Sequence, residues 1–85
     1  DMGRAEEGLS ELALAVKLAP EDAVARHELA SLLMDEGDYR TAIGHLREAA
    51  RLEPESFEIH LDLGLCYAEK GFYAEAERAY AKARW

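Results

Sequence analysis

The segment from Ala23 to Ser56, which decides the fold, reads AVARHELASLLMDEGDYRTAIGHLREAARLEPES. Apolar residues recur at helical spacing over residues 23–35 and 39–52, and Val24, Leu29, Leu32 and Leu33 fall on one apolar face of the first stretch. Between the two stretches, Gly37 can adopt the left-handed backbone that often ends a helix, and Asp38 can cap the next one. Pro54 ends the second stretch. The segment therefore predicts two amphipathic helices joined by a tight turn.

Similar stretches flank this pair. Residues 4–18 predict a helix that ends ahead of Pro20, and Asp22 is placed to cap the helix at 23–35. Ser56 is the expected cap of a fourth helix that begins at Phe57 and is ended by Gly71, and a fifth runs from Tyr73 toward the C-terminus. Helix formers are abundant and β-branched residues are few, so the fold class predicted is all-α, with about five helices.

The chain also repeats itself at an interval of 34 residues. At this offset Gly3, Gly37 and Gly71 align, as do Pro20 and Pro54. Small residues align at Gly8, Ala42 and Ala76 and at Ala30 and Gly64, while large ones align at Leu46 and Tyr80 and at Leu33 and Tyr67. Small residues allow close approach of the two helices of a pair, and large ones fill the space around the contact. A fixed period of this length is the signature of a repeat architecture.

The amino-acid composition restricts the classes of molecule that the protein is expected to bind. The net charge is −8, from 10 Lys and Arg against 18 Asp and Glu, and an acidic surface argues against nucleic acid and anionic membranes. The longest apolar run, from Leu12 to Val16, is too short to span a bilayer. Cys66 is the single cysteine, which excludes a disulfide framework, and its apolar neighbours predict a buried structural thiol.

The period of 34 and the pattern of small, large and proline positions resemble the tetratricopeptide repeat family. The resemblance implies a right-handed superhelix of antiparallel helix pairs and covers the whole chain, 1–85, as a single domain. Residues 1–20 would be the second helix of a partial repeat, 23–56 a complete repeat, and 57–85 a nearly complete one. Where the family often has Trp near the start of the first helix, this chain has Arg26 and His60.

The resemblance also implies a binding site, because the first helix of each repeat lines the concave face. The family's groove positions carried over to this chain are Val24, His27, Glu28, Ser31, Asp35, Glu58, Leu61, Asp62, Leu65 and Glu69. This set is apolar in the middle and acidic around it, so the expected ligand is an extended or helical peptide with apolar anchors beside Lys or Arg. A carboxylate tail, as clamped by the chaperone-binding members of the family, would meet like charge. An ordinary solvated acidic surface is an equally open interpretation.

The sequence contains little evidence for a catalytic or metal-binding site. His27, His45 and His60 lie on different helices or phases without a metal-binding spacing, and surface or packing roles are favoured for all three. No Ser/His/Asp or Cys/His arrangement and no glycine-rich phosphate loop is present, so neither an enzyme nor a cofactor is expected. The aromatic series Tyr39, Tyr73 and Tyr80, with Phe72, is interpreted as packing between helices.

The predicted function is a non-catalytic protein- or peptide-binding scaffold. We expect the chain to be a fragment of a longer protein, because it starts in the middle of a repeat. The alternative is a structural module that self-associates through uncapped end helices, since the first helix carries Leu9, Leu12, Leu14 and Val16 without its partner. No secretory signal is visible, which favours the cytoplasm, although a targeting segment could precede Asp1.

Overall fold

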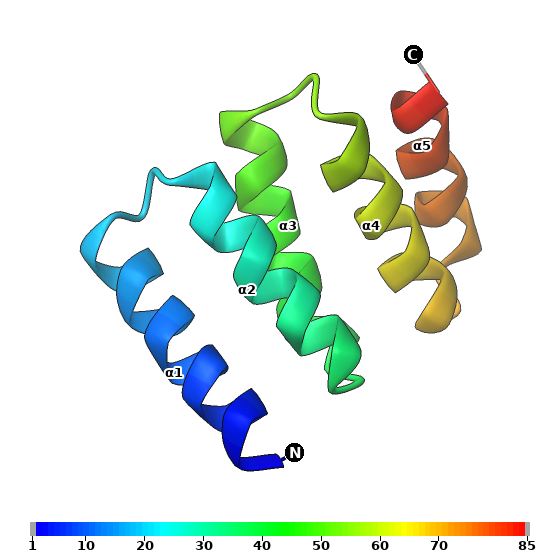
Figure 1. Ribbon diagram of the computed structural model, residues 1–85. Helices are drawn as coiled ribbons and strands as arrows, with labels where there is room; N and C mark the ends of the chain where they lie inside the picture. The colour runs from blue at the N-terminus through cyan, green and yellow to red at the C-terminus, as the bar shows by residue number, and fades with distance from the viewer. Residues whose placement is uncertain (1, 85) are drawn as a thin grey trace.

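Five helices follow one another along the chain in the computed structural model, which describes residues 2–84, with side chains from residue 6 to residue 83. They are α1 (Met2–Leu18), α2 (Ala23–Asp35), α3 (Tyr39–Leu52), α4 (Phe57–Glu69) and α5 (Tyr73–Arg84). Each helix packs on the next in an antiparallel zigzag, so the chain forms a layered stack (Figure 1). Residues 2–84 contain no strand, and none of their helices is long and apolar enough to cross a membrane. The all-α prediction is confirmed.

The turns form as their local chemistry predicts. Gly37 and Gly71 have φ of 81° and 82°, the left-handed region that glycine enters without a steric penalty. At the end of α2, the Gly37 N–H donates to the Met34 carbonyl and the Asp38 N–H to the Leu33 carbonyl. This is the hydrogen-bond pattern of a Schellman cap, and the same pattern recurs around Gly71.

Side-chain caps begin the following helices. Asp22 accepts from the Ala25 N–H at 3.1 Å and Asp38 from the Thr41 N–H at 3.2 Å. Ser56 accepts from the Ile59 N–H at 3.3 Å. Each cap satisfies one of the backbone donors that the first turn of a helix leaves unpaired. All three predicted caps are confirmed.

Small residues dominate the core. Ala30, Ala42, Leu46 and Ala49 are fully buried at the centre of the stack, together with Cys66 from α4. A second cluster of Val16, Ala25 and Leu29 joins α1 to α2. Because alanine side chains are short, the helix backbones can approach closely, as the repeat pattern predicted.

Glycine allows still closer contact at one position of α4. A Cβ built on the buried Gly64 would lie 2.4 Å from Cε1 of Tyr80, so the tyrosine ring rests directly on the α4 backbone. The glycine of α1 is less tightly covered, because a Cβ on Gly8 would lie 3.2 Å from Cδ1 of Leu32. The close approach of α4 and α5 therefore depends on the absence of a side chain at residue 64.

Two apolar side chains lie differently from the sequence prediction. Val24 is 65% exposed rather than part of the apolar face of α2, and Tyr73 is 70% exposed rather than packed between helices. Both lie in the first turn of a helix, where neighbouring helices cover some apolar residues, such as Ala23 and Ile59, and leave others exposed. Tyr39 and Tyr80 are partly buried as predicted, and the Phe72 ring meets Tyr67 edge-on at 6.5 Å although Phe72 is 48% exposed.

Candidate functional site

The ten residues expected at a groove all come from α2 and α4, and we call the surface that they form the α2–α4 surface. Seven are exposed and three, His27, Leu61 and Asp62, are partly buried. The exposed members are Val24, Glu28, Ser31, Asp35, Glu58, Leu65 and Glu69. None of the ten side chains is fully buried in the core, so each keeps some surface that a ligand can contact.

A hydrogen bond joins the two helices within this surface. Nε2 of His27 on α2 lies 2.7 Å from Oδ2 of Asp62 on α4, and the two side chains are only 24% and 23% exposed. Since α2 and α4 belong to successive predicted repeats, this bond ties one repeat to the next at the centre of the surface. The residue pattern placed both residues in the groove but gave no indication that they pair.

A depression of about 360 Å³ lies beside this hydrogen bond. Val24, His27 and Glu58 line it, together with the α3–α4 turn at Glu53, Glu55 and Ser56. The structure therefore brings three of the predicted residues into one hollow. The remaining members, among them Ser31, Asp35, Leu65 and Glu69, do not line it and extend the surface along the two helices.

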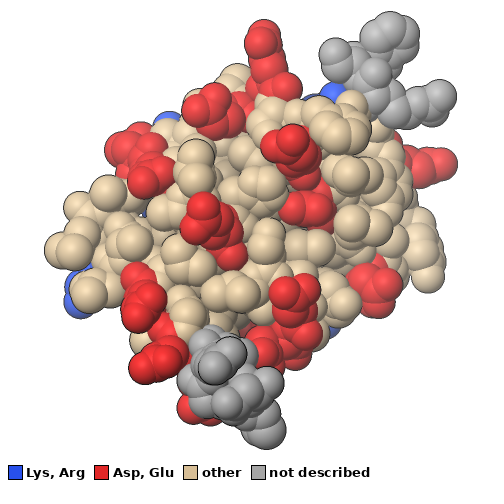
Figure 2. Space-filling model, viewed as in Figure 1, with Lys and Arg blue, Asp and Glu red and all other residues tan. Residues whose placement is uncertain are grey.

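Negative charge dominates the face of the molecule that Figure 2 shows. Carboxylate side chains spread across this face, while lysine and arginine appear only at its edges. On α2 and α4 the sequence has five carboxylates, Glu28, Asp35, Glu58, Asp62 and Glu69, against the single cation Arg26. A ligand of the α2–α4 surface therefore meets a negative potential.

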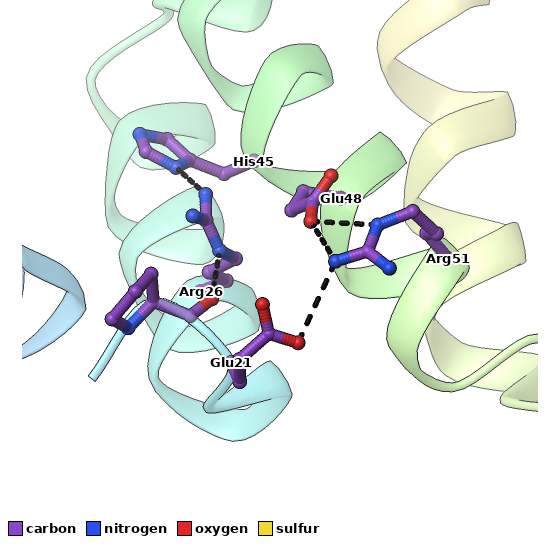
Figure 3. Close-up of polar contacts among 6 residues, drawn as sticks. Glu21, Arg26, His45, Glu48 and Arg51 are labelled. Carbon is purple, nitrogen blue, oxygen red and sulfur yellow. Dashed lines mark hydrogen bonds and ion pairs between the residues drawn. The ribbon is translucent and has the colours of Figure 1, made fainter.

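The side chain of Arg26 is engaged in contacts within the protein, because it joins α2 to the α1–α2 turn and to α3 (Figure 3). Its Nε donates to the Pro20 carbonyl at 2.8 Å, and Nη1 lies 3.3 Å from Nδ1 of His45 on α3. Burial, followed by the nearby Arg26 charge, lowers the pKa of His45 and so favours the neutral imidazole, the form that can accept from the guanidinium.

The same contact recurs one repeat later with a different residue. His60 is buried, and its Nε2 donates to the Pro54 carbonyl at 2.7 Å. Residues 26 and 60 are 34 apart, as are Pro20 and Pro54, so both repeats hold the carbonyl of their turn proline with a side chain six residues downstream. Arginine and histidine share no sequence signal here except the N–H donor, which is why the sequence did not reveal the role.

Glu21, Glu48 and Arg51 form an exposed ionic cluster near the C-terminal end of α3. Arg51 donates to Glu48 on the same helix and reaches Glu21 of the α1–α2 turn at 3.5 Å (Figure 3). The hydrogen bond from Arg51 is the largest cause of the lowered pKa of Glu48. Exposed pairs of this kind contribute little to stability, so the cluster orients Arg51 more than it stabilises the fold.

Cys66 is fully buried, as predicted. Desolvation, with smaller contributions from the negative charges of Asp62 and Glu69, raises the pKa of its thiol to about 11. Since the thiolate is the reactive form, this cysteine is a packing residue. Among the described residues, no group of three or more His, Cys, Asp or Glu side chains is placed to hold a metal ion.

Helix pairs that repeat every 34 residues also occur in known proteins. The sequence profile described as tetratricopeptide repeat matches residues 27–84. This chain belongs to the tetratricopeptide repeat family. Its repeats show the spacing of the family although the Trp position is occupied by Arg26 and His60.

Relatives with known names agree with this assignment. The tetratricopeptide repeat chain is 30% identical over 66 residues to anaphase-promoting complex subunit 3 of Dictyostelium discoideum, a match that covers 78% of this chain and 7% of the relative. Among solved structures, one of MamA AMB-1 superposes with a TM-score of 0.90 at 22% identity, over 95% of this chain and 48% of that one. The MamA RS-1 ArsTM double mutant superposes with a TM-score of 0.90 at 24% identity, over 98% and 47%.

These matches define the fold and the broad class of function. The chain spans less than half the length of the MamA structures and a small part of the subunit 3 relative. At 22% and 24% identity, the likeness to the MamA structures shows only that this chain has the same fold. Tetratricopeptide repeats are typical of scaffolds for protein–protein interaction, and the superhelix of antiparallel helix pairs is the framework on which such surfaces are built.

Proposed function

We propose that this tetratricopeptide repeat chain is a non-catalytic scaffold whose α2–α4 surface binds a segment of another protein. The segment carries apolar anchors flanked by Lys or Arg. The observation that carries the proposal is the combination of apolar side chains left exposed on this surface with an excess of carboxylates around them. Val24 is 65% exposed and Leu65 is 43% exposed, so an apolar partner that covered them would remove this surface from water.

The arrangement supports recognition in two parts. The hollow beside Val24 and His27 is the natural place for an apolar anchor, because it is concave and floored by Ile59 and Ala23. Glu58, at the rim of the hollow, and Glu28, one residue beyond His27 on α2, are exposed carboxylates that can pair with the flanking cations. A ligand that presents a carboxylate would instead be repelled, which disfavours capture of an acidic C-terminal tail.

The test is direct binding of labelled peptides by fluorescence anisotropy. An extended peptide in which leucine alternates with lysine should bind, and one in which leucine alternates with glutamate should not. The double variant Glu28→Lys/Glu58→Lys should weaken binding of the lysine peptide by about tenfold, because each reversal replaces an attraction by a repulsion.

The matched control is Glu11→Lys/Glu77→Lys, which makes the same total change of charge at two exposed residues of α1 and α5, outside this surface. It should leave the affinity within about twofold. Equal weakening by the control would mean that only net charge matters, and tighter binding of the glutamate peptide would reject the proposal.

A second function, self-association through the end helices, is favoured by one observation. Leu14 and Leu18 of α1 are 55% and 76% exposed, and they lie on the end helix of the stack, which packs mainly on α2. The discriminating variant is Leu14→Glu/Leu18→Glu, because Tyr80 on the other end helix packs against Gly64 and its replacement would disturb the fold. Sedimentation at increasing concentration should show loss of oligomers in this variant if the ends associate, and a monomer in both proteins would reject the idea.

A further inference from the structure

A broad depression of about 1000 Å³ lies between α3 and α5, above the start of α4. Its walls are Arg47, Ala50 and Arg51 on one side and Ala81 and Lys82 on the other, with His60 at its base. A smaller hollow of about 430 Å³ shares Arg47 and Lys82 and adds Arg78. We call the two together the α3–α5 groove. We propose that the α3–α5 groove binds an extended acidic peptide, a partner opposite in charge to the ligand of the α2–α4 surface.

The charge of the groove is the reverse of the charge of the whole chain. Four cations, Arg47, Arg51, Arg78 and Lys82, line it against two carboxylates, Glu55 and Glu75, although the chain carries a net charge of −8. The same reversal holds for the helices that form it. On α3 and α5 the sequence has six cations and three carboxylates, whereas α2 and α4 have five carboxylates and one cation. Positive charge is thus gathered on one pair of alternate helices.

Two of the four cations are free to bind. Arg51 pairs with Glu48 and Glu21, and Arg78 lies 3.5 Å from Glu75. By contrast, Arg47 and Lys82 make no ion pair with any residue between 6 and 83, and both are exposed. They belong to opposite walls of the groove, so an anionic segment lying between α3 and α5 would meet one on each side.

The spacing of the cations suits an extended chain. Arg47 and Arg51 are four residues apart on α3, as are Arg78 and Lys82 on α5, which separates the members of each pair by about 6 Å along the helix. In an extended peptide, side chains at alternate positions point the same way and lie about 6.6 Å apart. Glutamates at alternate positions could therefore pair with one wall, and the small side chains of Ala50 and Ala81 leave room for the peptide backbone.

A peptide fits this surface better than a nucleic acid does. A nucleic acid presents a phosphate at every step and needs a long basic track. Each wall of the groove offers cations over only about one helical turn, and beyond the groove the chain is acidic. A short acidic segment can use these few cations without reaching the repulsive surface around them.

The experiment uses a fluorescein-labelled peptide in which glutamate alternates with alanine, measured by anisotropy against the 85-residue chain. The wild-type protein should bind it with an affinity that falls as salt is added. The variant Arg47→Glu/Lys82→Glu should bind it at least about tenfold more weakly. The control Arg40→Glu/Lys70→Glu changes the net charge equally at two exposed cations outside the groove, and its affinity should stay within about twofold of wild type.

Three results would overturn the proposal. Equal weakening by the control would show that the peptide senses net charge alone. Tighter binding of a single-stranded oligonucleotide, lost in the groove variant, would assign the groove to nucleic acid. An oligomer that the groove variant abolishes, in a protein that binds no acidic peptide, would make a second copy of the chain the occupant. The Glu28→Lys/Glu58→Lys variant should keep full affinity for the acidic peptide, so failure at one surface is distinguishable from failure at the other.

Discussion

Replacing Gly64 by alanine should destabilise the protein, although the same change usually stabilises a helix. Gly64 lies in the interior of α4, where Gly→Ala is favourable by about 1 kcal/mol in the absence of other contacts. Here the new Cβ would lie 2.4, 2.5 and 2.9 Å from three ring atoms of Tyr80, all well inside the normal separation of carbon atoms, which begins at about 3.5 Å. Overpacking of this kind costs about 1 to 3 kcal/mol and exceeds the gain in helix propensity.

The expected net loss is therefore about 1 kcal/mol, equivalent to a Tm lower by about 4 to 8 °C for a domain of this size. Thermal and urea unfolding followed by circular dichroism at 222 nm would measure it. Gly44→Ala is the matched control, because Gly44 lies in α3 with nothing within 4 Å of its added Cβ, and this change should stabilise by up to about 1 kcal/mol.

A double-mutant cycle then isolates the contact. In a Tyr80→Ala background the obstruction is gone, so Gly64→Ala should become stabilising, with a coupling energy of about 2 kcal/mol between the two sites. If Gly64→Ala raised stability as much as Gly44→Ala in the wild-type background, the account of α4 and α5 packing through a bare backbone would be refuted.

Three further predictions concern the turns and the titrating groups. Gly37→Ala should lower the free energy of unfolding by about 1 kcal/mol, because residue 37 has φ of 81°, and urea unfolding beside Gly44→Ala would measure the difference. The native Cys66 thiol should resist Ellman's reagent and react only on unfolding. Since its pKa is raised from 9.0 to about 11, the unfolded state loses this proton first, and stability should fall by at most about 1.4 kcal/mol per pH unit between these two values. Replacing the thiol in Cys66→Ala should reduce this slope. Burial, followed by the charge of Arg26, lowers the pKa of His45 in the folded state, so its contribution to stability is present above pH 6.5 and is lost as pH falls. Urea titrations between about pH 5 and 7 should therefore show a shallower pH dependence in His45→Gln, and an unchanged slope would contradict the lowered pKa.

The sequence predicted the helices well because their ends depend on local chemistry. Gly37 and Gly71 end helices through backbone conformation, and Asp22, Asp38 and Ser56 begin them through one hydrogen bond each, so neighbouring residues suffice to locate them. The exposed Tyr73 was wrongly predicted for the same reason, since local pattern does not tell which first-turn residues another helix covers.

The repeat pattern of the sequence could not predict contacts between residues that are distant in the chain. The bond of His27 to Asp62 spans 35 residues, and its partners do not occupy equivalent repeat positions. The α3–α5 groove has a faint signal in the sequence, the cation pairs four residues apart at 47 and 51 and at 78 and 82, yet only the structure shows that these helix faces meet over one hollow. The ten residues of the α2–α4 surface remain a prediction as a binding site, although their placement on one pair of helices follows from the repeat.

Folding alone does not account for the separation of charge between the two helix pairs. The ion pairs of Arg51 and Arg78 are largely exposed, and such pairs contribute little to stability. Arg47 and Lys82 pair with no residue between 6 and 83, so their position in the groove adds no ion pair to the fold. The Arg47→Glu/Lys82→Glu variant should consequently unfold within about 2 °C of its charge-matched control Arg40→Glu/Lys70→Glu while losing the acidic peptide. A Tm well below that of the control would instead mean that these cations stabilise the stack, and the case for a second binding surface would lose its main support.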